Sequence, residues 1–320
     1  MTVHSLLPIT AASYEHHWLH DDDRDWPETN CYVDLWIEVL NALNLDPLAS
    51  LAFTLDVGFN GEQWDFFKHP ANDLWELYGL KVAEINVWRP LADHVIAHIE
   101  LGNLLTLEAD AYFLPDTAGV SYGTQHQKTT IVPQMIDVDN ERLGYFHNRS
   151  YFELDGDDFR GVLRTESTQT SLAPYVEVID TSLLRQPTRE ELADVAERLV
   201  RVHIGNRPDG NPPRELATRI TADLPWLRQH PDRFHGYAFG TLRQLGAWAS
   251  TASEFVKWLE RPELDGAAEA LASISATAKT CQFKLARVLA GRDVNLDELF
   301  DRMSEAWDSV YAPLVRVYGS

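Results

Sequence analysis

The first strong hydrophobic pattern in the chain has the spacing of an amphipathic helix, with apolar side chains at positions 32, 35, 36, 39, 40 and 43. Thr29 or Asn30 suits the cap position, and Pro27 ends any earlier helix. Cys31 then lies in the first turn, where backbone amides lack partners and the helix dipole is positive. We expect this environment to lower the pKa of the thiol and raise its reactivity. The alternative is a buried structural cysteine, since free cysteine is among the most buried residue types.

Between residues 72 and 154 the pattern changes from short helices to extended segments. Short helices are predicted over 72–78, closed by Gly79, and over 91–101, with a strand at 85–88 between them. Longer strand-like runs follow at 104–114, 128–138 and 143–154, and Asp139-Asn140-Glu141 suits a hairpin turn between the last two. Helices followed by an antiparallel sheet indicate the α+β class rather than repeated βαβ units.

From Thr188 onward the spacing of apolar residues is helical. Helices are predicted over 188–203, 213–230, 234–259, 264–290 and 295–317, and Thr188 with Glu191 forms a capping box at the first start. The Pro- and Gly-rich segment 205–213 is a predicted loop. We therefore predict two domains, residues 1–183 and an all-helical domain of residues 184–320. Cys281 falls inside one of these helices, away from any histidine, so we interpret it as structural.

The charge of the chain is unevenly distributed. The net charge is −22, and residues 1–180 hold 9 Lys+Arg against 30 Asp+Glu, whereas residues 181–320 hold 18 against 19. This acidity excludes a nucleic-acid partner, because a phosphate backbone requires a basic face. The excess of acidic residues instead favours solubility, or could attract a small cationic molecule to the first half of the chain. Without a long apolar run, a signal-peptide pattern or a disulfide framework, the sequence predicts a cytoplasmic protein with no membrane contact.

Histidines and aspartates are concentrated near the N-terminus, at positions 16, 17, 20, 21, 22 and 23. Such clusters can bind metal, but this spacing matches no zinc pattern and no second cluster completes it. We interpret the segment as a solvated arm lying over the site, and we expect neither a metal nor a bound cofactor.

Cysteine nucleophiles need a base for the thiol proton and a third group that orients the base. His126 lies at the start of the second predicted strand and Asn148 in the third, which is paired with it. A hairpin partner can place an amide oxygen beside the histidine ring. The order of Cys31, His126 and Asn148 is that of a papain-type site. His147 is an alternative base, and since adjacent strand residues face opposite ways only one of the pair 147/148 can point at Cys31.

These residues carry a resemblance to a known family. Residues 26–155 resemble the N-terminal domain of the butirosin-biosynthesis acyltransferase family, which is distantly related to papain-like and bacteriocin-leader cysteine peptidases. The matching pieces are Asn30-Cys31 opening a helix, the strand ending in Glu108-Ala-Asp-Ala-Tyr-Phe-Leu-Pro115, the following His126, and the strand with Asn148. The whole chain also resembles a bacterial family often encoded beside amino acid:carrier protein ligases.

The resemblance implies a papain-like fold and an acyltransferase with Cys31 as nucleophile, His126 as base and Asn148 as orienting residue. Papain-like peptidases have a Gln shortly before the Cys, where this chain has Asp25 and Trp26. The Cys31 amide and the Asn30 side chain are therefore the expected oxyanion donors.

The expected substrates follow from the resemblance and the charge. Members of the butirosin group transfer an acyl group from a carrier-protein thioester to an amine, so the 4′-phosphopantetheine arm would be supplied by an acyl or aminoacyl carrier protein. Asp110, Tyr112 and Asp116 are candidates for binding the small amine acceptor, and Arg201, Arg207 and Arg214 for docking the acidic carrier. A cysteine peptidase or amidase, in which water replaces the amine, and a non-catalytic module with an inert Cys31 are the alternatives.

Overall fold

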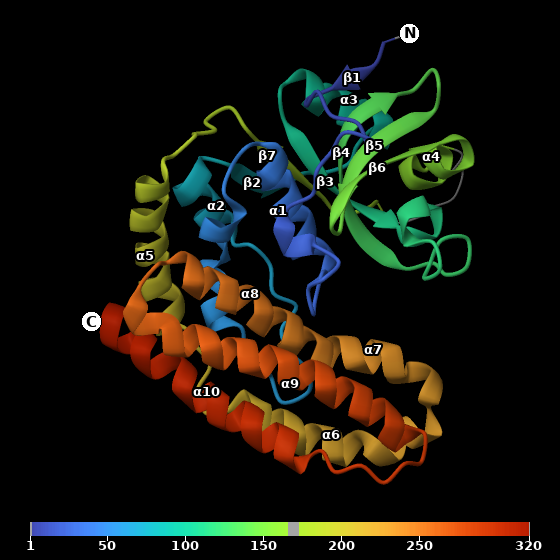
Figure 1. Cartoon of the computed structure of the whole chain (residues 1–320). Helices are drawn as coiled ribbons and strands as arrows, with labels where there is room; N and C mark the ends of the chain where they lie inside the picture. The colour runs from blue at the N-terminus through green and yellow to red at the C-terminus, as the bar shows by residue number, and fades with distance from the viewer. Residues whose placement is uncertain (1, 166–172, 320) are drawn as a thin grey trace. The chain divides into compact units, whose positions relative to one another are not determined.

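The computed structural model describes residues 2–165 and 173–319 and divides into two compact units. The first unit comprises Met1–Asp21, Cys31–Pro47 and His69–Pro187, and the second comprises Asp22–Asn30, Leu48–Lys68 and Thr188–Ser320. An antiparallel sheet dominates the first unit and helices dominate the second, so the predicted α+β class is confirmed at this level (Figure 1).

The sheet of the first unit is antiparallel at every pairing and has the order β2-β7-β3-β4-β5-β6, with β1 paired to β4. Its strands are β1 (His4–Ser5), β2 (Lys81–Glu84), β3 (Leu104–Asp110), β4 (Lys128–Asp137), β5 (Arg142–His147), β6 (Ser150–Asp155) and β7 (Val176–Asp180). Strand β4 pairs with β3 over its first residues and with β5 over its later ones. This change of partner brings the start of β4 between the ends of β3 and β5.

Helices α1 (Cys31–Ala42), α2 (Ala71–Tyr78), α3 (Leu91–Glu100) and α4 (Gly156–Leu163) complete the first unit, with short 3₁₀ turns η1 (Trp18–His20), η3 (Ala111–Phe113) and η4 (Pro115–Thr117). The core joins apolar residues of α3 and α4 to the odd-numbered positions of β3, including Leu105, Leu107 and Ala109. Residues 32–40 of α1 are all buried, which is the pattern of a helix enclosed on every side. Helix α1 packs against the strands β4 and β5 (Figure 1).

Most predicted elements of this unit are present, with the following differences. Helices α2 and α3, strand β4 and the turn at 139–141 agree with the pattern. The strand predicted at 85–88 is wrong, since β2 precedes it, and the strand predicted at 104–114 ends at Asp110. The predicted strand 143–154 is two strands, because Asn148 adopts a positive φ of 46° in a tight turn. Strand β7 and helix α4 were not predicted.

The end of α2 shows why its predicted stop is reliable. Gly79 has a φ of 73°, and its amide donates to the carbonyl of Trp75. A Cβ at Gly79 would lie 2.1 Å from the Leu183 carbonyl oxygen. Only glycine fits this left-handed position without moving the backbone.

The second unit consists of α5 (Arg189–Gly205), α6 (Pro212–Gln229), α7 (Phe234–Ala238), α8 (Gln244–Trp258), α9 (Asp265–Leu289) and α10 (Asp297–Tyr318), with η2 (Pro47–Asp56), η5 (Pro231–Arg233) and η7 (Pro262–Leu264). The helix predicted over 234–259 is interrupted by a π-helical turn, η6 (Phe239–Arg243). The capping box of Thr188 and Glu191 is confirmed. In Figure 1, α9 lies between α8 and α10. No helix in the described part of the chain is long and apolar enough to cross a membrane.

Two segments from the first quarter of the chain belong to this helical unit. Trp64 stacks on Trp248 of α8 with ring centroids 5.7 Å apart, and Trp307 of α10 lies 5.2 Å from Trp248. Trp26 packs so closely that a Cβ at Gly246 would lie 2.4 Å from its ring. The segments Asp22–Asn30 and Leu48–Lys68 therefore supply part of the core of the helices.

Candidate active site

Cys31 is the first residue of α1, as the pattern predicts, and is partly exposed. Burial is the largest influence on the thiol pKa and raises it, and the carboxylate of Asp34 also raises it. Hydrogen bonds from the Thr129 side chain and the Thr130 backbone lower the pKa, as does the charge of Lys128. Burial outweighs these contributions, so the pKa is raised overall. The expectation of a lowered thiol pKa is therefore wrong.

Thr129 connects the thiol to a buried histidine. Its Oγ1 lies 2.7 Å from His147 Nε2, and His147 Nδ1 lies 2.5 Å from Asp116 Oδ2. The other Asp116 oxygen accepts a hydrogen bond of 2.5 Å from the Tyr145 hydroxyl. His147 and Asp116 are almost fully buried, with side chains 2 % and 4 % exposed.

The hydrogen-bond partners determine which atoms of Thr129, His147 and Tyr145 carry a proton. An ionised Asp116 can only accept, so His147 donates from Nδ1 and its Nε2 is free to accept the Thr129 hydroxyl proton. Burial and the Asp116 charge raise the pKa of Tyr145, so its phenol remains a donor. Thr129 has one hydroxyl proton, which it can donate either to the Cys31 sulfur or to His147 Nε2. When it donates to His147, its oxygen can accept from the Cys31 thiol. The arrangement provides a route for a proton from Cys31 through Thr129 to His147, with Asp116 stabilising the imidazolium.

The predicted base His126 has different partners. Its Nδ1 lies 2.6 Å from Asp110 Oδ2, its ring stacks on Tyr112 with centroids 4.5 Å apart, and its side chain is 72 % exposed. No hydrogen bond or ion pair among the described residues joins His126 to Cys31 or Asn148. Asp110 and Asp116, expected to bind the acceptor, each hold a histidine ring instead.

Asn148 and Asn30 are placed differently from the expectation. Asn148 lies in the turn between β5 and β6 rather than within a strand, so it does not extend from β5 beside His126. The buried Asn30 donates from Nδ2 to the carbonyl of Phe67 at 3.1 Å, so one of its amide hydrogens is used within the helical unit. The structure thus brings together Cys31, Thr129, His147 and Asp116, and holds His126 separately with Asp110 and Tyr112.

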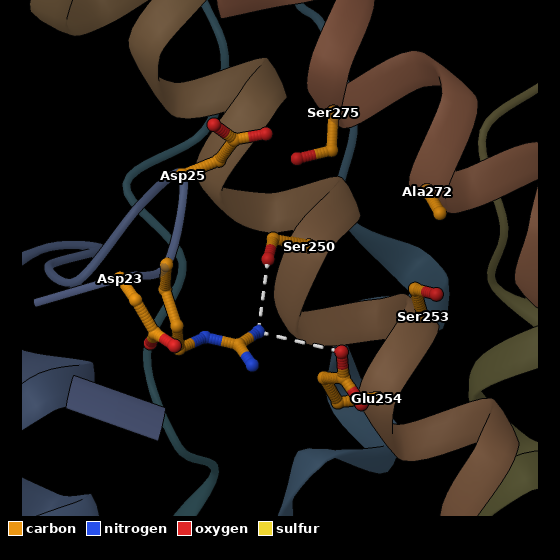
Figure 2. Close-up of a pocket in the computed structure, with 8 residues that line it drawn as sticks. Asp23, Asp25, Ser250, Ser253, Glu254, Ala272 and Ser275 are labelled. Carbon is orange, nitrogen blue, oxygen red and sulfur yellow. Dashed lines mark hydrogen bonds and ion pairs between the residues drawn. The ribbon is translucent and has the colours of Figure 1, made fainter. Parts of the chain in front are cut away.

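A pocket of about 350 Å³ lies in the helical unit, lined by residues of the 22–30 segment, α8 and α9 (Figure 2). Arg24 crosses it, with Nη2 3.2 Å from Ser250 Oγ and 3.4 Å from Glu254 Oε1. The guanidinium thus contacts two side chains of α8, and none of the predicted site residues lines the pocket.

The comparison with family models covers nearly the whole chain. Residues 15–181 match the DUF1839 N-terminal domain, and residues 189–316 match the DUF1839 C-terminal domain. The chain belongs to the DUF1839 family. No curated protein matches it significantly.

This DUF1839 protein contains a second buried charge cluster that sequence reasoning missed. His20 of the N-terminal arm lies between two carboxylates of α1, with Nδ1 in contact with Glu38 and Nε2 3.5 Å from Asp34. Glu38 also accepts from the Tyr14 hydroxyl and the His17 amide. The arm is therefore not solvated at His20, which is 2 % exposed. Among residues 2–165 and 173–319, no group of His, Cys, Asp and Glu side chains is arranged to hold a metal ion.

The two thiols of this DUF1839 protein should differ in reactivity. Cys31 is partly exposed, whereas Cys281 is fully buried and burial raises its pKa to about 12. We expect iodoacetamide to label Cys31 first, measured by peptide mapping over time. Because the Cys31 pKa is also raised, its labelling rate should continue to increase with pH above about 9, an ordinary thiol value. Preferential labelling of Cys281, or a rate that levels off below pH 8, would contradict this assignment.

Proposed function

We propose that this protein is a cysteine-dependent acyltransferase with a papain-like first unit. Cys31 would take an acyl or aminoacyl group from a carrier-protein thioester, and a small amine would then receive it. The observation that supports this best is the buried chain from the Cys31 thiol through Thr129 to His147 and Asp116. Exchange between two sulfurs is nearly balanced in energy, so a thiol with only moderate activation can perform it.

The proposed acylation step conserves atoms and charge. The Cys31 proton moves to Thr129 while the Thr129 proton moves to His147 Nε2, and the sulfur attacks the thioester carbonyl carbon. The bond from that carbon to the carrier sulfur breaks, and the departing thiolate takes the proton back along the same route. Cys31 at the start of α1 also offers its own backbone amide to the developing oxyanion.

Incubation with loaded carriers tests the proposal directly. Intact-protein mass spectrometry of the wild type should show the mass of one acyl group added to Cys31, and a Cys31→Ala variant should show none. Added amines should then discharge the acyl-enzyme faster than water does. Discharge by water alone would instead support the hydrolase.

A non-catalytic carrier-binding module is the second candidate, and one observation favours it. Burial raises the pKa of Cys31, which leaves less thiolate at neutral pH than a free cysteine has. Carrier binding without any acyl adduct on Cys31 would identify this function.

Carrier docking is predicted to depend on Arg201, Arg207 and Arg214, which are all exposed. Arg201 lies over the Tyr318 ring at 5.5 Å, Arg207 donates to the Ile204 carbonyl, and Arg214 lies 3.9 Å from Asp308. Replacing all three by Glu should raise the carrier KM by about tenfold or more, because the repulsion opposes encounter with an acidic carrier.

Alkylation of Cys31 should change little in this triple variant, and the wild-type KM should rise with salt. A triple variant with Glu at the exposed Arg287, Arg292 and Arg316 carries the same charge change and serves as the control. Equal KM values in the two variants would show that net charge, and not this surface, controls docking.

A further inference from the structure

The pair of His126 and Asp110 remains outside the route from Cys31 to His147. Asp110 Oδ1 accepts from the amides of Tyr112 and Gln127 at 3.0 and 3.2 Å, and Oδ2 accepts from His126 Nδ1 at 2.6 Å. Three donors therefore fix one carboxylate. The parallel Tyr112 ring at 4.5 Å fixes the plane of the imidazole.

This arrangement resembles an oriented general base. Because an ionised Asp110 only accepts, the His126 proton is on Nδ1, and Nε2 carries the lone pair. The side chain is 72 % exposed, so Nε2 can be reached from solvent. His147 offers no such access, since its side chain is 2 % exposed and its Nε2 is occupied by Thr129.

The strand register places this pair beside the start of β4, the segment that contacts Cys31. Asp110 pairs with Lys128 and Glu108 with Thr130, while Thr106 pairs with Glu177. Tyr32, which follows Cys31 in α1, donates to Glu177 at 2.8 Å, so α1 covers the face that carries residues 106, 108 and 110. Cys31 itself contacts Thr130 and is influenced by the charge of Lys128. His126 is thus held at the end of β3, next to Lys128 and the residues of β4 that contact Cys31.

Transfer of the acyl group to an amine releases a proton from the amine nitrogen, and the route from Cys31 through Thr129 to His147 does not remove it. When the amine nitrogen bonds to the thioester carbonyl carbon, it must lose a proton before the amide is stable. A small acceptor cannot reach the buried His147, whereas an exposed imidazole at the site can accept the proton directly.

We propose that His126, oriented by Asp110, is the general base for the acceptor amine in the second half of the reaction. This role rests on the proposed acyltransferase function. The amine nitrogen attacks the Cys31 thioester, its proton passes to His126 Nε2, and the carbon–sulfur bond breaks to release the Cys31 thiolate. His126 returns its proton to solvent and the thiolate takes one up, so the cycle closes without another reactant.

The test separates the two half-reactions. Cys31 is first loaded with acetyl-pantetheine thioester, and the acyl-enzyme is then mixed with glycinamide or with hydroxylamine while mass spectrometry follows the adduct. His126→Ala should be acylated at the wild-type rate but should transfer to glycinamide about 100-fold more slowly, the usual scale for a general base. Hydroxylamine, a strong nucleophile that is largely uncharged at neutral pH, should discharge both proteins alike.

Two further variants complete the test. Asp110→Asn should slow glycinamide transfer less than His126→Ala does, and added imidazole should partly restore the histidine variant. His16→Ala removes another exposed histidine near a carboxylate, 3.3 Å from Asp21, and should behave as wild type. Normal acylation with unchanged glycinamide transfer in His126→Ala would overturn the role of His126 alone. Failure of the wild type to acylate would overturn the proposed function, and this role with it.

Discussion

Replacing His147 by Gln is expected to slow the acylation of Cys31 by about two orders of magnitude or more. Gln is polar and of similar size, so it can keep hydrogen bonds to Thr129 and Asp116, but it cannot take a proton at neutral pH. The rate is measured by quenching the reaction with acetyl-pantetheine thioester at intervals and weighing the intact protein. Circular dichroism should show an unchanged fold.

The hydroxyl of Thr129 provides a matched pair of controls. Thr129→Val removes the group between the thiol and His147 while keeping the shape, so acylation should slow by about tenfold or more. Thr130 contacts Cys31 through its backbone, so Thr130→Val should acylate normally. Asn148→Ala should also have little effect, since its side chain lies in a turn. Slow acylation in His126→Ala with a normal rate in His147→Gln would show that the exposed histidine serves the thiol instead.

His20→Ala should destabilise the protein by about 3–5 kcal/mol, the usual range when one member of a buried charge cluster is removed. The substitution leaves the carboxylates of Asp34 and Glu38, 1 % and 0 % exposed, without the imidazolium between them. Urea unfolding measures the loss. His16→Ala in the same arm should change stability little, because that ion pair is exposed. Adding Glu38→Gln to His20→Ala should recover part of the loss, whereas equal stability of the single and double variants would exclude uncompensated charge as the cause.

The same cluster predicts how stability depends on pH. Burial, the largest influence, lowers the His20 pKa, but hydrogen bonds and charges of Asp34 and Glu38 outweigh it and raise the pKa to about 9. A raised folded pKa gives stability that is complete below the unfolded value of about 6.5 and is lost as pH rises through about 9. The difference in unfolding free energy between wild type and His20→Ala should therefore shrink from pH 6 to pH 10. A difference that grows over this range would show that His20 is neutral in the folded protein.

Several elements that were predicted correctly bury apolar residues at regular spacing. Helices α5 and α10 each bury one stripe, whereas strand β4 and helix α8 are buried along most of their length. Strand β2 is mostly exposed, so its residues carry no pattern of alternation. The turn at Asn148 lacks the Gly or Pro that usually marks one, and asparagine tolerates the positive φ that divides the strand.

The candidate site was predicted in its components but not in its contacts. The position of Cys31 followed from helical spacing, but the raised pKa follows from its burial, which no local pattern shows. Strand alternation predicted that the side chains of His147 and Asn148 face opposite ways, but it could not decide which of them belongs to the site. Only the folded structure shows that Asp116 of η4 is the carboxylate partner of His147. His20 was missed because its partners lie on α1, where Asp34 and Glu38 have the spacing of an exposed polar stripe although both are buried.

The division of the chain into interleaved units has a consequence for the order in which the protein can fold during synthesis. Trp64 leaves the ribosome before any of the helices after Thr188 exist, although its stacking partner Trp248 and neighbour Trp307 belong to those helices. The sheet can form first. The aromatic-rich segments Asp22–Asn30 and Leu48–Lys68 can be covered by the helices of their own unit only after those helices have been synthesised. During that interval these segments are the natural target of a chaperone, and a chain that stops early would present them permanently to aggregation.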